Sequence, residues 1–185
     1  MQTPSPFSSM LFTETPLQGA FVVELQPHKD ERGLFGRTFC TREFHAQGLT
    51  GTFVQCNTSW NAFKGTVRGL HYQLPPLCEV KLVRCTAGAI WDVIVDLRPD
   101  SSTYLQHVGI ELTAANRRAL YIPGMFAQGF QSLQDGSEVF YQMSEFYSPE
   151  LARGLRYNDP KLGIDWPLPI LLISEKDKGW ALLPD

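Results

Sequence analysis

The sequence predicts an all-β protein, folded as a closed barrel or a two-sheet sandwich. Short segments rich in Val, Ile, Phe and Tyr recur along the 185 residues, and Gly, Pro, Asn and Asp separate them. No stretch keeps the apolar period of a sustained helix. A chain of this length usually forms one domain. We therefore expect one domain over residues 1–185, with 1–10 as an N-terminal arm and 159–185 as a tail packed on the barrel.

Seven segments are predicted to be strands, because they are rich in β-forming residues and alternate with a period of two. They are residues 20–27, 51–60, 79–88, 89–99, 107–112, 118–123 and 138–147. The segment 67–73, "VRGLHYQ", also has the character of a strand. Helical signals are short: 41–48, between Thr41 and Gly48, then 113–118, and 174–180, which begins with a serine suited to an N-cap.

Composition argues against several function classes. Lys and Arg number 16 against 19 Asp and Glu, a net charge of −3, so a nucleic-acid-binding surface is not expected. Apolar runs such as 169–173 are far below the roughly 18 residues that a membrane span needs. No secretory signal is expected at the start. The chain has no C-x-x-C pair, which favours reduced thiols in a cytoplasm for Cys40, Cys56, Cys78 and Cys85.

Strand parity places Gln55, Asn57 and Ser59 on one face of the segment 53–59, because alternate side chains point to opposite faces. A half-buried strand usually turns its polar face to water. In the alternative, the strand lines a barrel that holds a polar ligand, and these three side chains point inward. Parity alone is compatible with both.

Parity also sorts the charged residues of two apolar segments. In 89–97, Asp92 and Asp96 lie opposite a continuous apolar face, and for both we expect a solvated edge. That apolar face consists of Trp91, Val93, Val95 and Leu97. Lys81 shares a face with apolar residues of 79–88, and we expect its stem to follow apolar surface while its ammonium reaches water.

The pair Arg68 and His71 poses a problem of geometry. The two residues are three apart, so a regular strand would place them on opposite faces. If both serve one site, Gly69 must permit a bulge or turn between them.

The distribution of reactive residues favours acid–base chemistry. A metal site of the barrel type needs clustered histidines with a carboxylate, whereas here Gln73 stands two residues after His71 and the histidines are scattered as His28, His45, His71 and His107. No G-x-S-x-G motif or Cys/His pattern indicates a nucleophile. A lone histidine with tyrosines and cationic side chains suits proton transfer on a carbonyl compound. No metal or other cofactor is expected.

Motifs along nearly the whole chain resemble one family. In order they are "DERGLFGRTF" (30–39), "FVQCNTSWNAFKGTVRGLHYQLPP" (53–76), "KLVRCTAGAIWDVIVDLRPDSSTY" (81–104), "YIPGMFAQGF" (121–130), "VFYQMSEFYSPE" (139–150), "YNDPKLGIDWP" (157–167) and "SEKD" (174–177). Together they resemble the dTDP-4-dehydrorhamnose 3,5-epimerase family of nucleotide-sugar enzymes. The stretch 64–73 and the pair "KLVRC" with "DVIVDLR" are the most specific.

The resemblance implies a cupin-like double-stranded β-helix, or jelly roll, without a metal, usually as a homodimer that exchanges strands. It implies epimerisation beside the C4 ketone of a nucleoside-diphospho-4-keto-6-deoxyhexose, through an enolate. By resemblance, His71 is the base, Asp177 its partner and Tyr141 the acid on the opposite face. Lys81 is the cation near the enolate oxygen. The implied substrate contacts are Arg32, Arg37, Gln55, Asn57, Ser59, Arg68, Gln128, Tyr147 (stacked on the nucleotide base) and Lys176.

Two positions depart from the family pattern. Gln128 stands in "FAQGF" where the family usually has a histidine, and Arg37 stands where many members have glutamate. Glutamine donates and accepts hydrogen bonds but does not titrate near neutral pH. Three hypotheses follow: a 3,5-epimerase acting on dTDP-4-dehydro-6-deoxy-D-glucose, a mono-epimerase acting at C3 or C5 of a related dTDP-, CDP- or GDP-linked keto sugar, and a sugar-nucleotide binder without turnover.

Overall fold

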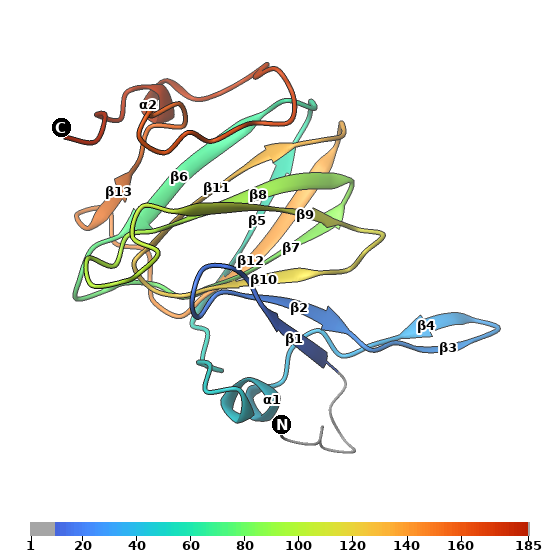
Figure 1. The fold of residues 1–185 in the computed structure, drawn as a ribbon. Helices are drawn as coiled ribbons and strands as arrows, with labels where there is room; N and C mark the ends of the chain where they lie inside the picture. The colour runs from blue at the N-terminus through green and yellow to red at the C-terminus, as the bar shows by residue number, and fades with distance from the viewer. Residues whose placement is uncertain (1–9, 185) are drawn as a thin grey trace.

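The computed structural model describes residues 10–184, which form two antiparallel sheets packed face to face (Figure 1). Strands of the first sheet follow the order β1-β2-β10-β7-β12-β5, and those of the second follow β13-β6-β11-β8-β9. A separate hairpin, β3–β4, projects from the body (Figure 1). The all-β prediction is confirmed.

The first sheet consists of β1 (Met10–Glu14), β2 (Phe21–Leu25), β10 (Ala119–Ile122), β7 (Lys81–Ala87), β12 (Ser137–Met143) and β5 (Gln55–Asn61). The second consists of β13 (Ala152–Gly154), β6 (Val67–Gln73), β11 (Phe126–Ser132), β8 (Ala89–Asp96) and β9 (His107–Thr113). The hairpin pairs β3 (His28–Asp30) with β4 (Gly33–Phe35), and the two helices are α1 (Thr41–Ala46) and α2 (Glu175–Lys178).

The main core lies between the sheets because alternate residues of the central strands are apolar and point inward. The first sheet contributes Val83, Cys85, Leu120, Ile122 and Val139. The second contributes Ile90, Ile94, Leu112, Phe126 and Phe130. All of these side chains are buried, so the two sheets hold each other through one continuous apolar layer.

The outer faces of both sheets are also covered. Phe44 of α1 is fully buried against the first sheet, where its ring lies 5.9 Å from that of Tyr121. On the second sheet, the tail residues Leu162, Ile164 and Trp166 pack over the outward side of β8. The tail also extends the sheet edge, because the Val67 amide donates to the Leu172 carbonyl oxygen at 2.8 Å.

The expectation of a solvated edge for Asp92 and Asp96 is wrong. Both side chains are 0% exposed, because their face of β8 is the inner face that carries Ile90 and Ile94. The opposite, continuously apolar face is covered by the tail. Both faces of β8 are therefore buried.

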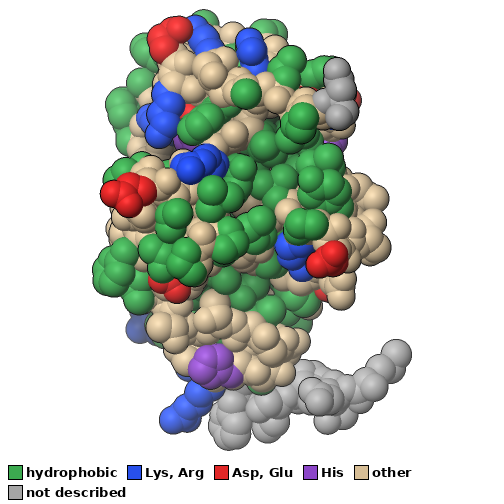
Figure 2. Space-filling model, turned by 90° about the vertical axis from the view of Figure 1, so that its left-hand side faces the viewer, with side chains coloured by type: hydrophobic (Ala, Val, Ile, Leu, Met, Phe, Trp, Pro, Cys, Tyr) green, Lys and Arg blue, Asp and Glu red, His purple; other side chains and the backbone are tan. Residues whose placement is uncertain are grey.

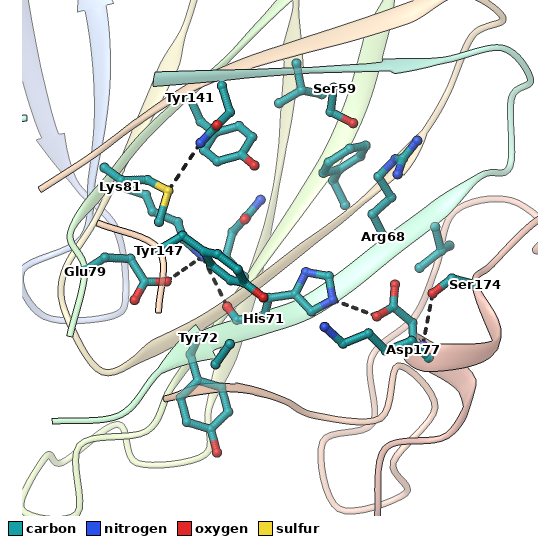
Figure 3. A pocket seen from close by; sticks show the side chains of 18 of the residues that line it. Ser59, Arg68, His71, Tyr72, Glu79, Lys81, Tyr141, Tyr147, Ser174 and Asp177 are labelled. Carbon is teal, nitrogen blue, oxygen red and sulfur yellow. Dashed lines mark hydrogen bonds and ion pairs between the residues drawn. The ribbon is translucent and has the colours of Figure 1, made fainter. Parts of the chain in front are cut away.

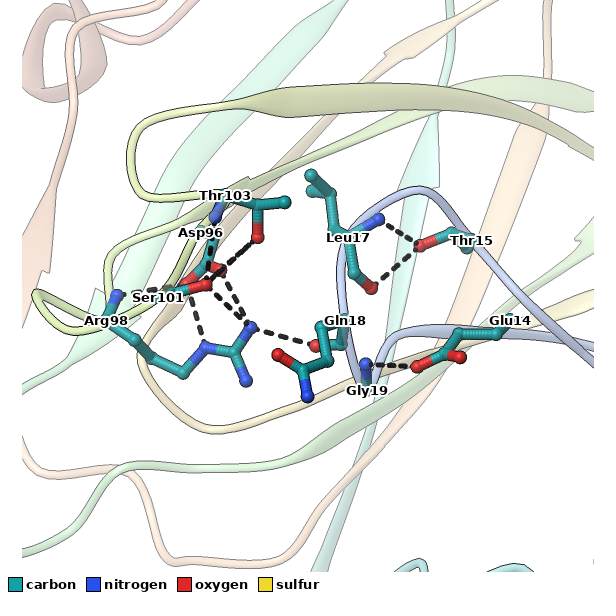
Figure 4. A network of polar contacts seen from close by, with 9 residues as sticks. All are labelled: Glu14, Thr15, Leu17, Gln18, Gly19, Asp96, Arg98, Ser101 and Thr103. Carbon is teal, nitrogen blue, oxygen red and sulfur yellow. Dashed lines mark hydrogen bonds and ion pairs between the residues drawn. The ribbon is translucent and has the colours of Figure 1, made fainter.

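Buried Asp96 is held as a carboxylate by a cluster of donors (Figure 4). Arg98 donates from Nε at 2.9 Å and from Nη2 at 2.7 Å, and the hydroxyls of Ser101 and Thr103 donate at 2.6 and 2.7 Å. Burial alone would raise the pKa of Asp96, but these donors outweigh it and hold the pKa well below its usual range. Arg98 also donates to the Gln18 carbonyl oxygen, which ties the loop after β8 to the β1–β2 turn.

Each of the seven predicted strands overlaps an observed strand, with ends that differ by a few residues. The largest differences are in 51–60, where β5 begins only at Gln55, and in 138–147, where β12 already ends at Met143. The strands β1, β3, β4, β11 and β13 were not among the predicted segments. Of the expected arm 1–10, only Met10 is described, and it is 2% exposed at the start of β1.

The surface retains exposed apolar side chains. Figure 2 shows hydrophobic side chains spread across the middle of one face, with Lys and Arg side chains gathered at its upper end. Large exposed apolar residues include Leu34, Phe35, Trp60, Phe63, Phe146, Tyr147, Leu171 and Leu172. In the described part of the chain, no helix has the length and hydropathy of a membrane span.

Candidate active site

A cavity of about 900 Å³ opens between the two sheets (Figure 3). Strands β5, β7 and β12 supply one wall, and β6 and β11 supply the other. The tail and α2 close one side. Polar and charged side chains around it include Gln55, Asn57, Ser59, Arg68, His71, Glu79, Lys81, Gln128, Tyr141, Tyr147, Arg153, Lys176 and Asp177.

A bulge in β6 brings Arg68 and His71 to this one cavity. His71 pairs with Gln128 of β11 and Arg68 pairs with Phe130, so the register shifts between the two pairs. Gly69 lies at the shift with φ +119°, and a Cβ there would stand 2.5 Å from the Cα of Gly129. Only glycine fits both that backbone conformation and that close approach. The bulge that a shared site requires is therefore present.

His71 is held by Asp177, although the two are 106 residues apart in the sequence. The His71 Nε2 lies 2.6 Å from Asp177 Oδ1, and the Asp177 side chain is only 5% exposed. Asp177 lies in α2, where its amide donates to the Ser174 hydroxyl as an N-cap contact. The expected Ser174 cap is confirmed.

The second Asp177 oxygen accepts from the Gly69 amide at 3.3 Å. Burial would raise the pKa of Asp177, but the His71 hydrogen bond and charge, with the Gly69 and Ser174 contacts, lower it below its usual range. Asp177 is therefore an acceptor at neutral pH. His71 Nε2 accordingly carries the proton of this contact, and Nδ1 is left as the basic nitrogen.

Tyr141 reaches the cavity from β12 in the opposite sheet, where its neighbours are Asn57 of β5 and Val83 of β7. Burial raises the pKa of Tyr141 above its usual range. The cation of Arg68 lowers this pKa and the carboxylate of Glu79 raises it, with a net upward shift. The phenol therefore keeps its proton at neutral pH and is available as a proton donor.

Lys81 turns into the cavity wall and not to the outer surface, so the expectation of a solvated ammonium is wrong. The residue is 7% exposed, and its Nζ lies 3.1 Å from Glu79 Oε1 inside the cavity wall. Nζ also donates to the His71 carbonyl oxygen at 3.3 Å. The side chain turns inward because a buried carboxylate compensates its charge.

Gln128 is fixed from behind by the buried Asp92. Its Nε2 donates to Asp92 Oδ1 at 2.5 Å. Burial raises the pKa of Asp92 to about 7, against smaller downward effects of Gln128 and Lys81. Because Gln128 is the cross-strand neighbour of His71, its amide borders the same space as the histidine ring.

The polar row of β5 lines the cavity. Gln55, Asn57 and Ser59 are half-buried, whereas the intervening Cys56, Thr58 and Trp60 are exposed. The inward alternative is therefore the correct one for this strand. Gln55 also accepts a hydrogen bond from the amide of Tyr147 at 3.2 Å, which holds the start of that loop at the cavity rim.

Two residues expected at the substrate lie away from the cavity of their own chain. Arg32 is on the projecting hairpin, where it pairs with Asp30 and its side chain is 85% exposed. Arg37 pairs with Glu43 of α1 at 2.8 Å. Neither lines the cavity.

Sequence reasoning missed Glu79 and Arg153, which line the cavity, and Asp92, which holds the cavity-lining Gln128. Glu79 had a usable signal, because it is two residues before Lys81 and strand parity places the two on one face. Asp92 also had a signal, because it alternates with Ile90 and Ile94 and therefore shares their apolar face. Within residues 10–184, no group of three or more His, Cys, Asp or Glu side chains is placed to hold a metal ion.

Comparisons with known proteins agree with this geometry. A family model described as dTDP-4-dehydrorhamnose 3,5-epimerase matches residues 14–185. The enzyme of that name from Methanothermobacter thermautotrophicus is 45% identical over 175 residues, which are 93% of this chain and 94% of that protein.

Solved structures extend the likeness to the fold. The dTDP-4-dehydrorhamnose 3,5-epimerase from Bacillus anthracis, with TDP and PPi bound, has a TM-score of 0.91 at 40% identity, covering 94% of this chain and 99% of that chain. A 3′-monoepimerase from Streptomyces bikiniensis, in complex with dTDP-quinovose, has a TM-score of 0.82 at 31% identity, covering 91% and 85%. The cupin-like fold is thereby confirmed. The chain belongs to the dTDP-4-dehydrorhamnose 3,5-epimerase family of isomerases.

Proposed function

We propose that this protein epimerises C3 and C5 of dTDP-4-dehydro-6-deoxy-D-glucose, giving dTDP-4-dehydro-L-rhamnose. The observation that carries the proposal is the placement of a carboxylate-bound histidine and a protonated tyrosine on opposite sheets around one cavity, His71 with Asp177 and Tyr141 (Figure 3). Relatives of 40 to 45% identity bear the name of this activity.

The His71 ring is suited to remove a proton from a carbon beside the C4 ketone. The ketone acidifies the protons on both neighbouring carbons, and their removal gives an enolate. Asp177 orients the ring through Nε2 and stabilises the imidazolium that forms once Nδ1 has taken the proton.

Tyr141 is suited to return a proton from the opposite face. It lies on the other sheet, and its raised pKa keeps the phenol protonated until it acts. Removal on one face followed by return on the other inverts the carbon. Lys81, within the same cavity, provides a cation for the oxygen of the enolate.

The rest of the cavity is suited to a nucleotide sugar. Tyr147, 52% exposed at the rim, offers a ring on which the nucleotide base can stack. Arg68 and Lys176 provide cations, and the β5 amides of Gln55 and Asn57 provide hydrogen bonds for the sugar or phosphates. Relatives solved with TDP and with dTDP-quinovose support this class of ligand.

We also propose that the protein is a homodimer with exchanged strands. The β3–β4 hairpin projects from the body and carries Arg32 together with the exposed Leu34 and Phe35 (Figure 1). Because the hairpin projects from the body of its own protomer, it can reach a second copy. Each copy would then supply Arg32 to the cavity of the other.

Hydrogen exchange in heavy water tests the activity. The protein is incubated with dTDP-4-dehydro-6-deoxy-D-glucose in D₂O, and deuterium at C3 and C5 is located by NMR. We expect label at both carbons. His71→Ala should lower the exchange rate by about 10²- to 10⁴-fold, because a general base is removed.

The matched control is His45→Ala, which removes a histidine from the exposed side of α1 and should exchange at the parent rate. Full exchange in His71→Ala, with the melting temperature of the parent, would contradict the assignment of the base.

A second candidate function is a mono-epimerase acting at C3 or C5 of a related dTDP-, CDP- or GDP-linked keto sugar. The observation that favours it is Gln128, which stands beside His71 where a titratable histidine was expected. A 3′-monoepimerase is among the structural relatives. Label at a single carbon would select this function, and tight binding without any label would select a non-catalytic binder.

A further inference from the structure

A buried carboxylate in the cavity wall has no role in the chemistry described above. Glu79 precedes β7, and its side chain is 4% exposed. Its Oε1 lies 3.1 Å from Lys81 Nζ. Its Oε2 is buried and has no hydrogen-bond partner among the described residues. Because a buried carboxylate oxygen without a donor is costly, we expect a bound ligand to supply one.

Lys81 leaves a complementary group beside it. An ammonium has three hydrogen-bond donors, and here one is directed to Glu79 and another to the His71 carbonyl oxygen. The third remains for a ligand. The wall therefore presents a donor and an acceptor side by side, on Lys81 at the start of β7 and on Glu79 two residues before it (Figure 3).

The acceptor excludes the phosphate and ketone oxygens of a nucleotide sugar. Phosphate and ketone oxygens only accept hydrogen bonds, and phosphate is repelled by a carboxylate. A hydroxyl group can donate. A ketone with a hydroxyl on the adjacent carbon matches the pair, because it places an acceptor and a donor on neighbouring atoms.

We propose that Glu79 is a specificity-determining residue that accepts a hydrogen bond from the hydroxyl beside the ketone, while Lys81 donates to the ketone oxygen. The inference rests on the proposed function. In a 4-keto-6-deoxyhexose, C3 carries a hydroxyl, whereas C5 on the other flank carries a methyl group. The sugar can bind with its ketone oxygen at Lys81 in two orientations, with either C3 or C5 beside Glu79. The Glu79–Lys81 pair selects the orientation that places C3 there.

The test compares two substrates on the same enzyme: the dTDP-4-keto-6-deoxy sugar and its 3-deoxy analogue. The parent should show a kcat/KM for solvent exchange about 10- to 100-fold higher for the hydroxylated sugar, since hydrogen bonds to charged groups have this strength. Glu79→Gln keeps an oxygen for Lys81 but replaces the second acceptor by an NH₂ group. The preference should fall about tenfold or more.

The ratio of the kcat/KM values for the two sugars does not change with partial unfolding, because both substrates meet the same fraction of active enzyme. TDP carries no hexose, so its affinity should stay within about twofold of the parent. The matched control is Glu24→Gln, which breaks an exposed ion pair with Arg118 and should leave the preference unchanged.

An unchanged preference in Glu79→Gln would overturn the proposal. A loss of TDP affinity as large as the loss of preference would also overturn it, because the effect would then lie on the nucleotide. A parent enzyme that exchanges neither sugar would instead contradict the proposed function.

Discussion

At the residue scale, Asp177 decides which nitrogen of His71 is basic. Asp177→Asn replaces an acceptor by a neutral amide of the same shape, so it no longer fixes the tautomer or stabilises the imidazolium. We expect kcat for exchange to fall about 100-fold or more, with the KM changed much less. Steady-state exchange kinetics measure both. A rise in KM with an unchanged kcat would assign Asp177 to binding instead.

Asp92 has a pH-dependent effect on stability. Its pKa is raised to about 7 in the folded protein, against about 3.9 in an unfolded chain. Between these values the folded state holds a proton that the unfolded state has lost, so its contribution to stability is present below about pH 4 and lost as pH rises towards 7.

Asp92→Asn removes this titration. Relative to the parent, the variant should gain about 1–4 kcal/mol of unfolding free energy between pH 4 and pH 8, measured by urea denaturation. The exposed Asp100, changed to Asn, provides the control and should show no such gain. If the unfolding free energies of Asp92→Asn and the parent change in parallel with pH, the raised pKa of Asp92 would be contradicted.

At the element scale, the bulge in β6 is the feature that assembles the site. Gly69→Ala would place a Cβ 2.5 Å from the Gly129 Cα and 2.9 Å from the Gln128 oxygen, at φ +119°. Both atoms belong to backbone that cannot move freely, so we expect a loss of about 2–5 kcal/mol of stability and misplaced Arg68 and His71.

The control for this change is Gly136→Ala. Gly136 also has a positive φ, +67°, but nothing lies within 4 Å of its Cβ position, so only the backbone strain is added. Equal losses in the two variants would show that the close approach of β6 and β11 is unimportant.

Most central strands were predictable because their apolar alternation is local in the sequence. The strand β11 was not, since "FAQGFQS" mixes polar and small residues that only the facing strands explain. The same limit applied to Lys81 and Asp92. Parity gave their face, but whether that face met water or the cavity depended on the opposite sheet.

Partners distant in sequence were also beyond local patterns. The His71–Asp177 contact joins β6 to α2, and only the motif resemblance suggested it. The placement of Glu79 on the same face as Lys81 was predictable, because the two residues are two apart in the sequence. Its burial was not, since an acidic residue in an isolated sequence is expected at the surface.

At the scale of the whole molecule, the projecting hairpin predicts complementation between two inactive variants. Arg32→Ala and His71→Ala each lack one group of the proposed shared site. In a mixed dimer, the chain with intact His71 receives Arg32 from its partner, so one of the two sites is complete. Co-expression should restore about a quarter of the parent activity, from half of the dimers and half of their sites.

Phe35→Ser provides the accompanying test of association. Its side chain is 75% exposed, so the change should leave a lone chain stable but weaken the dimer, as sedimentation velocity would show. Absence of complementation between dimeric variants would mean that Arg32 does not act across the interface.

The position of Asp177 in the tail has a consequence for biosynthesis. The barrel strands precede residue 155, whereas the carboxylate that equips His71 is made some hundred residues after the histidine itself and reaches it only when the tail lies along β6. In the order of synthesis, all the strands of the two sheets therefore precede the residue that orients His71. If His71 is the base, a chain that ends before residue 177 lacks the carboxylate that orients its ring, and we expect it to lose at least as much activity as Asp177→Asn.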